Sequence, residues 1–309
     1  MKSIQKKLSF EILIDDFFEN VNSNSCLTPI NNKRVLSLLN NFEDGKWRYS
    51  KFQSFIWDNI AETALSKKER DSLVNHSLLT SAAKNLRLTD KQDKIGAGSE
   101  LAEIVLYGIM KHHFHALPVV PKIFYKQNPQ DNAKGADSVH IVISEDDFTI
   151  WFGEAKFYTS IEDVNLGRIV ESVTNSLKTD KLKKENAIII NINDIDLIIK
   201  NEGMRQNIKE ALSPQESIDT IKHKINIPIL LIHECPITKV QHDTTQSYKE
   251  DMTAHHIDRA TAYFKKQIKK TNTIHKYNEI NFHIILFPVP SKKAIVDKFL
   301  SNVKHYKEQ

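Results

Sequence analysis

The sequence predicts an α/β protein with a mixed central sheet flanked by helices, preceded by a mixed region with a helical bias. Two observations predict this fold class. Beyond about residue 95, apolar runs typical of strands alternate with segments of helical periodicity. The segment 137–158 is also typical of a hairpin, because two apolar runs rich in β-branched and aromatic residues flank the polar turn 145–147.

The composition is that of an ordinary globular protein. The chain has 309 residues, 40% hydrophobic and 27% charged, which allows one large domain or two modest ones. We expect an N-terminal region, residues 1–90, that packs on a core domain formed by residues 91–309. The formal net charge of +4 is compatible with a nucleic-acid partner without requiring one.

The cysteines and the apolar runs indicate a cytoplasmic protein. Cys26 and Cys235 are the only two cysteines and lie far apart, so a disulfide framework is not expected and a reducing compartment fits best. The first residues lack the apolar run of a signal peptide. Nothing approaches the length of a membrane span, so we expect no membrane partner.

The first region should contain a strand and two helices. Residues 9–14 form an apolar run typical of a strand. Tyr49–Leu65 has apolar side chains near helical spacing, which predicts an amphipathic helix. Ser66-Lys-Lys-Glu69 has the spacing of a capping box, so a second helix should begin there. No catalytic constellation is visible before residue 90.

A largely buried helix should run from Ser99 to about His113. The glycines before Ser99 end a polar connection, and Ser99 is the predicted N-cap. His112, His113 and His115 lack further zinc ligands nearby in sequence, so we interpret them as a solvated helix end. Residues 118–126 should form a strand, whose prolines favour an edge position.

The predicted hairpin carries the residues that most need an explanation. Phe148–Tyr158 is apolar on both faces, which predicts a buried central strand. Glu154 and Lys156 point to the same face, because strand side chains alternate, and Asp137 opens the partner strand. A buried carboxylate and a buried ammonium are costly unless they are paired with each other or with a metal.

Metal-assisted hydrolysis explains this set of charges. Asp137 and Glu154 would supply oxygen ligands to a hard cation, Mg²⁺ before others, and Mn²⁺ should also support activity. Lys156 would position or help deprotonate the attacking water and balance developing charge. The alternative is a purely structural buried pair of Glu154 and Lys156.

The last third of the chain should continue the alternation of helices and strands. The predicted elements are a helix from a capping box at Thr159–Glu162 to about Lys178, a buried strand at Ala187–Ile190 beside the hairpin, a helix start at Ser213, a strand at Ile229–His233 after Pro228, a helix at Glu250–Lys270, a strand at Phe282–Val289 and a helix at Lys292–Val303.

Two further features of this part were weighed for function. His233 and Cys235 suggest a thiol nucleophile, but no third orienting group is visible in the sequence. Four lysines end the predicted helix at 250–270 and either complement its dipole or contact a phosphate backbone.

The chain resembles a known group of nucleases at the hairpin. Asp137 followed by Glu154-Ala-Lys156 on the next strand is the D…E-x-K arrangement of the restriction-endonuclease-like superfamily. The runs Gly-Ala-Asp137-Ser-Val-His and Trp-Phe-Gly-Glu154-Ala-Lys156-Phe-Tyr are similar to the HamA family, nuclease-like subunits of the Hachiman anti-phage defence system. The run Glu100-Leu-Ala-Glu103-Ile-Val-Leu-Tyr is similar too, so the resemblance covers the central third most closely.

The resemblance implies a restriction-endonuclease-like core, DNA as the substrate and a helicase partner, HamB. It also places Glu103 as a third acidic metal ligand beside Asp137 and Glu154, whereas a solvated glutamate near a helix N-terminus is the alternative. The implied function is a magnesium-dependent deoxyribonuclease that acts as a defence effector. Two competing functions are a catalytically inactive nuclease fold that binds DNA or a partner, and a structural adaptor.

Overall fold

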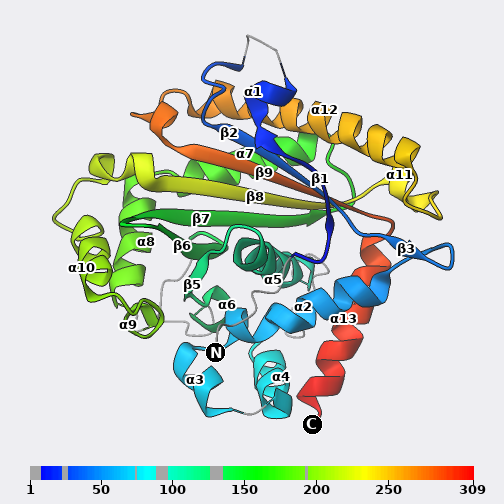
Figure 1. Ribbon diagram of the computed structural model, residues 1–309, viewed down its shortest axis with the longest axis horizontal. Coiled ribbons are helices and arrows are strands. Elements are labelled where there is room, and N and C mark those ends of the chain that lie inside the picture. Colours follow the sequence, from blue (N-terminus) through cyan, green and yellow to red (C-terminus); the bar gives the residue numbers. More distant parts are fainter. Residues whose placement is uncertain (1–7, 23–26, 74, 88–96, 126–134, 192–193) are drawn as a thin grey trace.

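A seven-stranded mixed sheet forms the centre of the protein (Figure 1), in the order β1-β2-β9-β8-β7-β6-β5. The computed structural model describes residues 8–22, 27–73, 75–87, 97–125, 135–191 and 194–309. The strands of this sheet are β1 (Glu11–Phe17), β2 (Lys33–Leu39), β5 (Leu117–Val120), β6 (Ser138–Ser144), β7 (Asp147–Tyr158), β8 (Ile225–Glu234) and β9 (Asn281–Val289).

Helices flank this sheet, as the sequence predicts. They are α1 (Phe18–Val21), α2 (Tyr49–Ala64), α3 (Lys67–Ser72), α4 (Asn75–Lys84), α5 (Ala97–His112), α6 (Lys122–Tyr125), α7 (Asp163–Ser176), α8 (Thr179–Asn191), α9 (Asp194–Ile198), α10 (Glu202–Ala211), α11 (Pro236–Lys239), α12 (Gln246–Thr271) and α13 (Lys292–Lys307). A small hairpin of β3 (Phe42–Glu43) and β4 (Lys46–Trp47) stands apart from the main sheet. No described helix is long and apolar enough to cross a bilayer.

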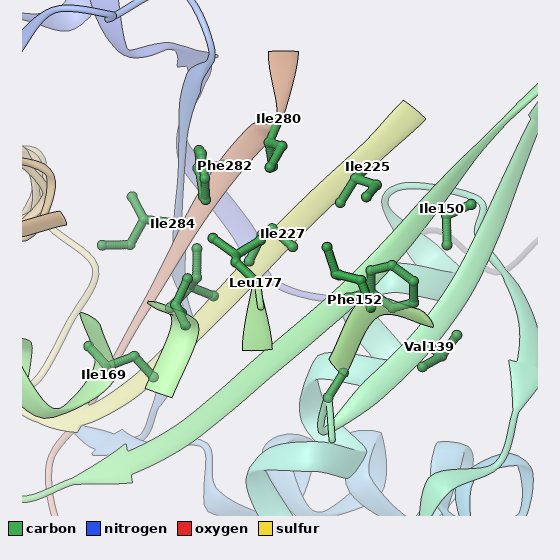
Figure 2. Close-up of a cluster of buried hydrophobic side chains, with 14 of the residues drawn as sticks. Val139, Ile150, Phe152, Ile169, Leu177, Ile225, Ile227, Ile280, Phe282 and Ile284 are labelled. Carbon is green, nitrogen blue, oxygen red and sulfur yellow. The ribbon is translucent and has the colours of Figure 1, made fainter. Parts of the chain in front are cut away.

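The sheet is parallel in its middle and antiparallel at both edges. Strands β2, β9, β8 and β7 run parallel to one another, whereas β1, β6 and β5 are antiparallel to their neighbours. Helices α7, α8 and α12 bury one face, and α2, α5 and α13 bury the other (Figure 1). Figure 2 shows the first core, where side chains of β6 to β9 meet those of α7.

The hairpin prediction is confirmed. Strands β6 and β7 pair in register from Ser138 opposite Gly153 to Ser144 opposite Asp147. Strand β7 lies inside the sheet and is covered on both faces, as its apolar sequence predicts. The helices predicted at 250–270 and 292–303 and the strand at 282–289 are also confirmed, as α12, α13 and β9.

The N-terminal region is partly as predicted. The strand predicted at 9–14 is β1, which begins two residues later and ends at Phe17, and the helix at 49–65 is α2. Ser66 forms the predicted capping box, in which its Oγ accepts from the Glu69 amide at 3.3 Å and the Glu69 carboxylate accepts from the Ser66 amide at 2.9 Å. Strands β1 and β2 belong to the central sheet, and the division at residue 90 stays a prediction.

The strand predicted at Ala187–Ile190 is wrong. These residues end helix α8, whose buried side chains Leu182, Asn186 and Ile189 recur at helical spacing. The neighbour of β7 is instead β8, which begins at Ile225. Four consecutive apolar residues are compatible both with a buried strand and with one end of a buried helix. Here they continue the helix that the preceding polar residues begin.

Three helix starts are also wrong. Helix α5 begins at Ala97, so Ser99 lies inside it and not at its N-cap. Helix α7 begins at Asp163 after Glu162, which makes no side-chain capping bond, so the box at Thr159 does not form. Ser213 begins a turn that leads to a short 3₁₀ helix at Ile218–Thr220, because the chain must turn there toward β8.

Two strand predictions need a correction. The strand at 118–126 ends at Val120, and α6 occupies 122–125, although its edge position is confirmed. The strand predicted at 229–233 is β8 and starts four residues earlier, so Pro228 lies inside it. Pro228 has no amide hydrogen to donate to the neighbouring strand. The pairing of β7 with β8 is accordingly interrupted between Trp151 and Glu154.

Candidate active site

Strands β6 and β7 bring the predicted catalytic residues into one place. Asp137 directly precedes β6, and its amide donates to the Gly153 carbonyl at 2.8 Å. This bond extends the hairpin by one residue and places Asp137 beside Glu154. Strand alternation puts Glu154 and Lys156 on the same face of β7, as predicted.

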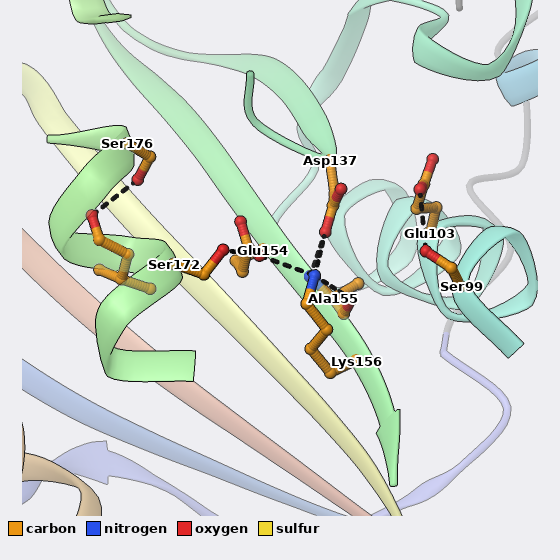
Figure 3. Close-up of polar contacts among 9 residues, drawn as sticks. Ser99, Glu103, Asp137, Glu154, Ala155, Lys156, Ser172 and Ser176 are labelled. Carbon is orange, nitrogen blue, oxygen red and sulfur yellow. Dashed lines mark hydrogen bonds and ion pairs between the residues drawn. The ribbon is translucent and has the colours of Figure 1, made fainter. Parts of the chain in front are cut away.

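The Lys156 ammonium lies between the two carboxylates (Figure 3). Its Nζ lies 3.0 Å from Asp137 Oδ2 and 2.7 Å from Glu154 Oε1. It also donates to the Ala155 carbonyl at 3.2 Å, so its three hydrogens have three acceptors. Asp137 Oδ2 accepts a further bond from the Ala155 amide at 3.1 Å, which fixes the carboxylate against β7.

Ser172 on α7 is a site residue that the sequence analysis missed. Its Oγ donates to Glu154 Oε1 at 2.5 Å and holds that carboxylate from the helix side (Figure 3). Arg168 and Glu171 on the same helix are exposed, and Glu171 pairs with Lys270. Since only the pairing of α7 with β7 selects Ser172, no local sequence signal marks it.

The charges of the site are strongly coupled. Burial and the nearby Asp137 charge raise the pKa of Glu154, although Lys156 and Ser172 act in the opposite direction. Burial would lower the pKa of Lys156, but the Asp137 and Glu154 carboxylates outweigh it and raise that pKa above its usual value. Lys156 is therefore an ammonium at neutral pH in this arrangement.

A second buried ion pair supports the approach to Asp137. Glu185 on α8 accepts from Lys122 Nζ at 2.6 Å and from the Ala136 amide at 2.9 Å. A Cβ added at Gly135 would lie 1.6 Å from Glu185 Oε1, so a larger residue there would displace this carboxylate from its present position. The Gly-Ala-Asp run thus has a structural reason, because Gly135 and Ala136 dock on Glu185 and Asp137 follows.

A cavity of ≈ 270 Å³ opens beside these residues. Glu154, Ser172 and Glu185 are among its lining residues. The side-chain exposure of Glu154 is only 7%, whereas that of Lys156 is 29%, so the lysine side chain is the more accessible of the two.

Glu103 is buried on α5, and its carboxylate lies 3.5 Å from Ser99 Oγ. In Figure 3, Asp137 lies between Glu154 and Glu103, and Glu103 approaches from the helix on the other side of β7. The solvated alternative is wrong, because the exposed fraction of Glu103 is 4%. Its role as a third metal ligand stays a prediction.

The basic residues considered for phosphate contact are dispersed. Lys266 and Lys270 on α12 pair with Asp163 and Glu171 on α7, which is a structural use of their charge. Lys126 and Lys134 flank and enter the loop before Asp137 and could reach a phosphate by sequence, but they lie outside the described residues. The solvated-end interpretation of His112 and His113 is incomplete, because their rings contact Asn59 and Asp15.

A comparison with known protein families shows to which family the chain belongs. A family model described as HamA matches residues 15–303 of the 309. The chain belongs to the HamA family. A search of curated proteins found no match.

Membership of the HamA family makes this a protein of the Hachiman anti-phage defence system. The HamA match includes the end of β1 and all other strands of the sheet, the hairpin among them. It therefore extends well beyond the central third, back to residue 15 and forward to residue 303.

The donor set at the hairpin of this HamA chain fits a hard divalent cation. Asp137 and Glu154 offer only oxygen atoms, the ligands that Mg²⁺ and Mn²⁺ prefer. The charge of Asp137 disfavours ionisation of Glu154, and a cation bound by both carboxylates would relieve this repulsion. Lys156 now partly fulfils that role, since its ammonium contacts both groups.

Proposed function

We propose that this chain is a metal-dependent deoxyribonuclease that hydrolyses DNA phosphodiesters as an effector of anti-phage defence. The observation that carries the proposal is the convergence of Asp137, Glu154 and Lys156 at one point of the sheet. A buried carboxylate beside a half-buried one, joined by a lysine, is costly to maintain, and the D…E-x-K nucleases use this set for hydrolysis.

Each residue has a distinct role in the proposed reaction. Asp137 and Glu154 hold the cation, with Glu103 as a further ligand; the bound cation supplies Lewis-acid activation of the phosphodiester. The Lys156 ammonium positions the attacking water by exchanging one of its present acceptors for it, and balances the charge that develops on the phosphate. Ser172 and the Ala155 amide hold the two carboxylates in orientation.

A plasmid assay tests the proposal. Purified protein should nick or cut plasmid DNA with Mg²⁺ or Mn²⁺ and not with a chelator. Glu154→Ala should lose the cation and Lys156→Ala the charge balance, so each should reduce cutting at least about 100-fold. Exposed residues supply matched controls: Glu171→Ala and Lys265→Ala remove the same charges from α7 and α12 and should cut normally. Unchanged cutting by both site variants would exclude the proposed roles.

The competing function is binding of DNA or a partner without hydrolysis. One observation favours it: the three hydrogens of the Lys156 ammonium already have protein acceptors, as in a purely structural ion triad. Thermal melting separates the two functions. If the site binds a cation, the wild-type protein should melt at a higher temperature with Mn²⁺ than without it, and Asp137→Ala should abolish that rise. No rise in the wild-type protein would favour the structural triad.

DNA binding should depend weakly on sequence, because the chain shows no base-reading motif.

Control of such a nuclease falls to a helicase partner similar to HamB. The helicase would supply the use of ATP, because this chain has no phosphate-binding P-loop in its sequence. Co-expression and size-exclusion chromatography should recover one complex whose cutting is weaker until the helicase engages DNA. Separate elution would contradict the association, and equal cutting in both states would contradict the restraint.

A further inference from the structure

A second group of metal-ligating side chains lies at the carboxyl end of β8. His233 is the penultimate residue of β8, Cys235 follows the strand, and His255 lies on α12, which packs beside that end of the sheet (Figure 1). One ligand atom of each residue lies within 4.8 Å of the other two. Among the described residues, this is the group that brings three histidine, cysteine or carboxylate ligands together in this way.

The surroundings hold two of these ligands in fixed positions. Cys235 and His233 are each 1% exposed, and the Cys235 amide donates to the Val289 carbonyl of β9 at 2.9 Å. The His233 ring is oriented by His256, whose Nε2 lies 3.1 Å from His233 Nε2. His256 in turn lies 2.6 Å, through Nδ1, from Ser37 Oγ. In metal sites, the ring nitrogen of a histidine that does not bind the metal is typically held by a hydrogen bond.

His255 is the ligand that must move to complete the site. His255 is half-buried on α12, and its ring centroid lies 6.0 Å from that of His233. Tetrahedral Zn²⁺ with bonds of about 2.0–2.3 Å places its ligand atoms about 3.3–3.8 Å apart, so binding requires the group to close by at most about 1.5 Å. A side chain on the surface of a helix can make this movement by a small rotation.

We infer that His233, Cys235 and His255 form a binding site for Zn²⁺ that joins the end of β8 to α12. The donor set of two imidazoles and a thiolate is soft to borderline, which favours Zn²⁺ over Mg²⁺ or Ca²⁺. Three protein ligands leave a fourth position for water on the half-buried side at His255.

The site is separate from the carboxylates of the proposed nuclease centre. Glu154 lies opposite Ile229 on β8, and His233 is four residues further along, a distance of about 13 Å at the rise of a strand. The inference therefore does not depend on the proposed function. The bound ion would fix α12 against the sheet whose β7 strand carries Glu154 and Lys156.

Metal binding by the full, untagged chain tests the inference. After chelator treatment, the protein should bind one equivalent of Zn²⁺ in competition with a chromophoric chelator, and its Tm should rise. Co²⁺ should give a thiolate-to-metal charge-transfer absorption. His255→Gln, at a half-buried position, should weaken Zn²⁺ binding by more than the about 10- to 100-fold that the loss of a ligand's supporting contact costs. Cys235→Ser should abolish the charge-transfer band.

Two control variants make the result specific. His275→Gln removes a histidine whose side chain is 73% exposed, and it should bind Zn²⁺ as the wild-type protein does. Glu154→Ala should also keep the ion, which separates this site from the carboxylates. The inference is overturned if the wild-type protein binds neither Zn²⁺ nor Co²⁺, if His255→Gln and Cys235→Ser bind as tightly as wild type, or if Glu154→Ala abolishes binding.

Discussion

At the scale of single residues, the protonation of Glu154 decides what the proposed site can do. Glu154 must be ionised to bind a cation, and its pKa is raised by burial and by Asp137. A raised pKa means that the ionised form becomes dominant only at a higher pH than for an exposed glutamate. Metal affinity and cutting should therefore increase as the pH rises through this pKa and reach a plateau above it.

Replacing Ser172 with alanine should move that limb of the pH profile. The Ser172 hydroxyl stabilises the ionised Glu154, so its loss should raise the pKa of Glu154 further. The loss of a hydrogen bond to the charged form disfavours ionisation, which predicts a shift of the limb toward higher pH. Plasmid cutting measured from pH 5 to pH 9 checks this shift.

The matched control is Ser176→Ala on the same helix. The Ser176 hydroxyl donates to the Val173 carbonyl and not to Glu154, so the pH profile should stay in place (Figure 3). An identical shift in both serine variants, or none in Ser172→Ala, would show that Ser172 does not set the protonation of Glu154.

At the scale of elements, α6 and α8 hold the segment that leads into β6. Lys122 on α6 and Glu185 on α8 form an ion pair with 2% and 4% side-chain exposure, and Glu185 also accepts the Ala136 amide. The Glu185 carboxylate therefore connects both helices to the segment that leads to Asp137. The position of Asp137 therefore depends on a contact between helices that lie far apart in the sequence.

Breaking this ion pair on one side should be costly. Glu185→Leu leaves a buried lysine without its carboxylate, and the loss of one partner of a buried pair costs about 3–5 kcal/mol. The double variant Lys122→Met with Glu185→Leu removes both charges and should recover most of that free energy of unfolding. Urea unfolding of the wild-type protein, both single variants and the double variant measures the coupling.

The nuclease readout distinguishes support of the site from stability alone. The double variant lacks the acceptor for the Ala136 amide, so its cutting should stay below that of the wild-type protein although its stability returns. Additive changes in stability, or full cutting by the double variant, would contradict the proposed support of Asp137.

At the scale of the whole molecule, buried histidines should make the fold sensitive to acid. Burial lowers the pKa values of His140, His233 and His283 to about 3 and that of His256 well below its usual value. In the unfolded chain these pKa values return to about 6.5. Between those limits the unfolded state binds more protons, so stability falls as the pH decreases below about 6.5.

His140→Gln tests this contribution at a position away from the His233 group. The variant cannot take up the proton, so its free energy of unfolding should depend less on pH by about 1 kcal/mol per pH unit between pH 5 and pH 6. Urea unfolding at pH 7.5, 6.0 and 5.0 measures the slopes. Equal slopes for the variant and the wild-type protein would exclude His140 as a source of the acid sensitivity.

Much of the hairpin and its charges was predictable because the physics is local. Alternation along a strand is a property of the backbone, so Glu154 and Lys156 had to share a face once β7 was recognised. The capping box at Ser66 likewise depends on four consecutive residues. The apolar periodicity of α2 and α12 identified them because each buries one side against the sheet.

The sequence by itself thus determined the mixed α/β class, the hairpin and the set Asp137, Glu154 and Lys156. Only the tertiary structure decided what surrounds them. Ser172 and Glu185 reach the site because α7 and α8 cross the sheet there, and no local pattern encodes a contact between distant elements. The run at 187–190 became helix, and His233, Cys235 and His255 became one group, for the same reason: long-range packing selects among conformations and contacts that the local sequence permits equally.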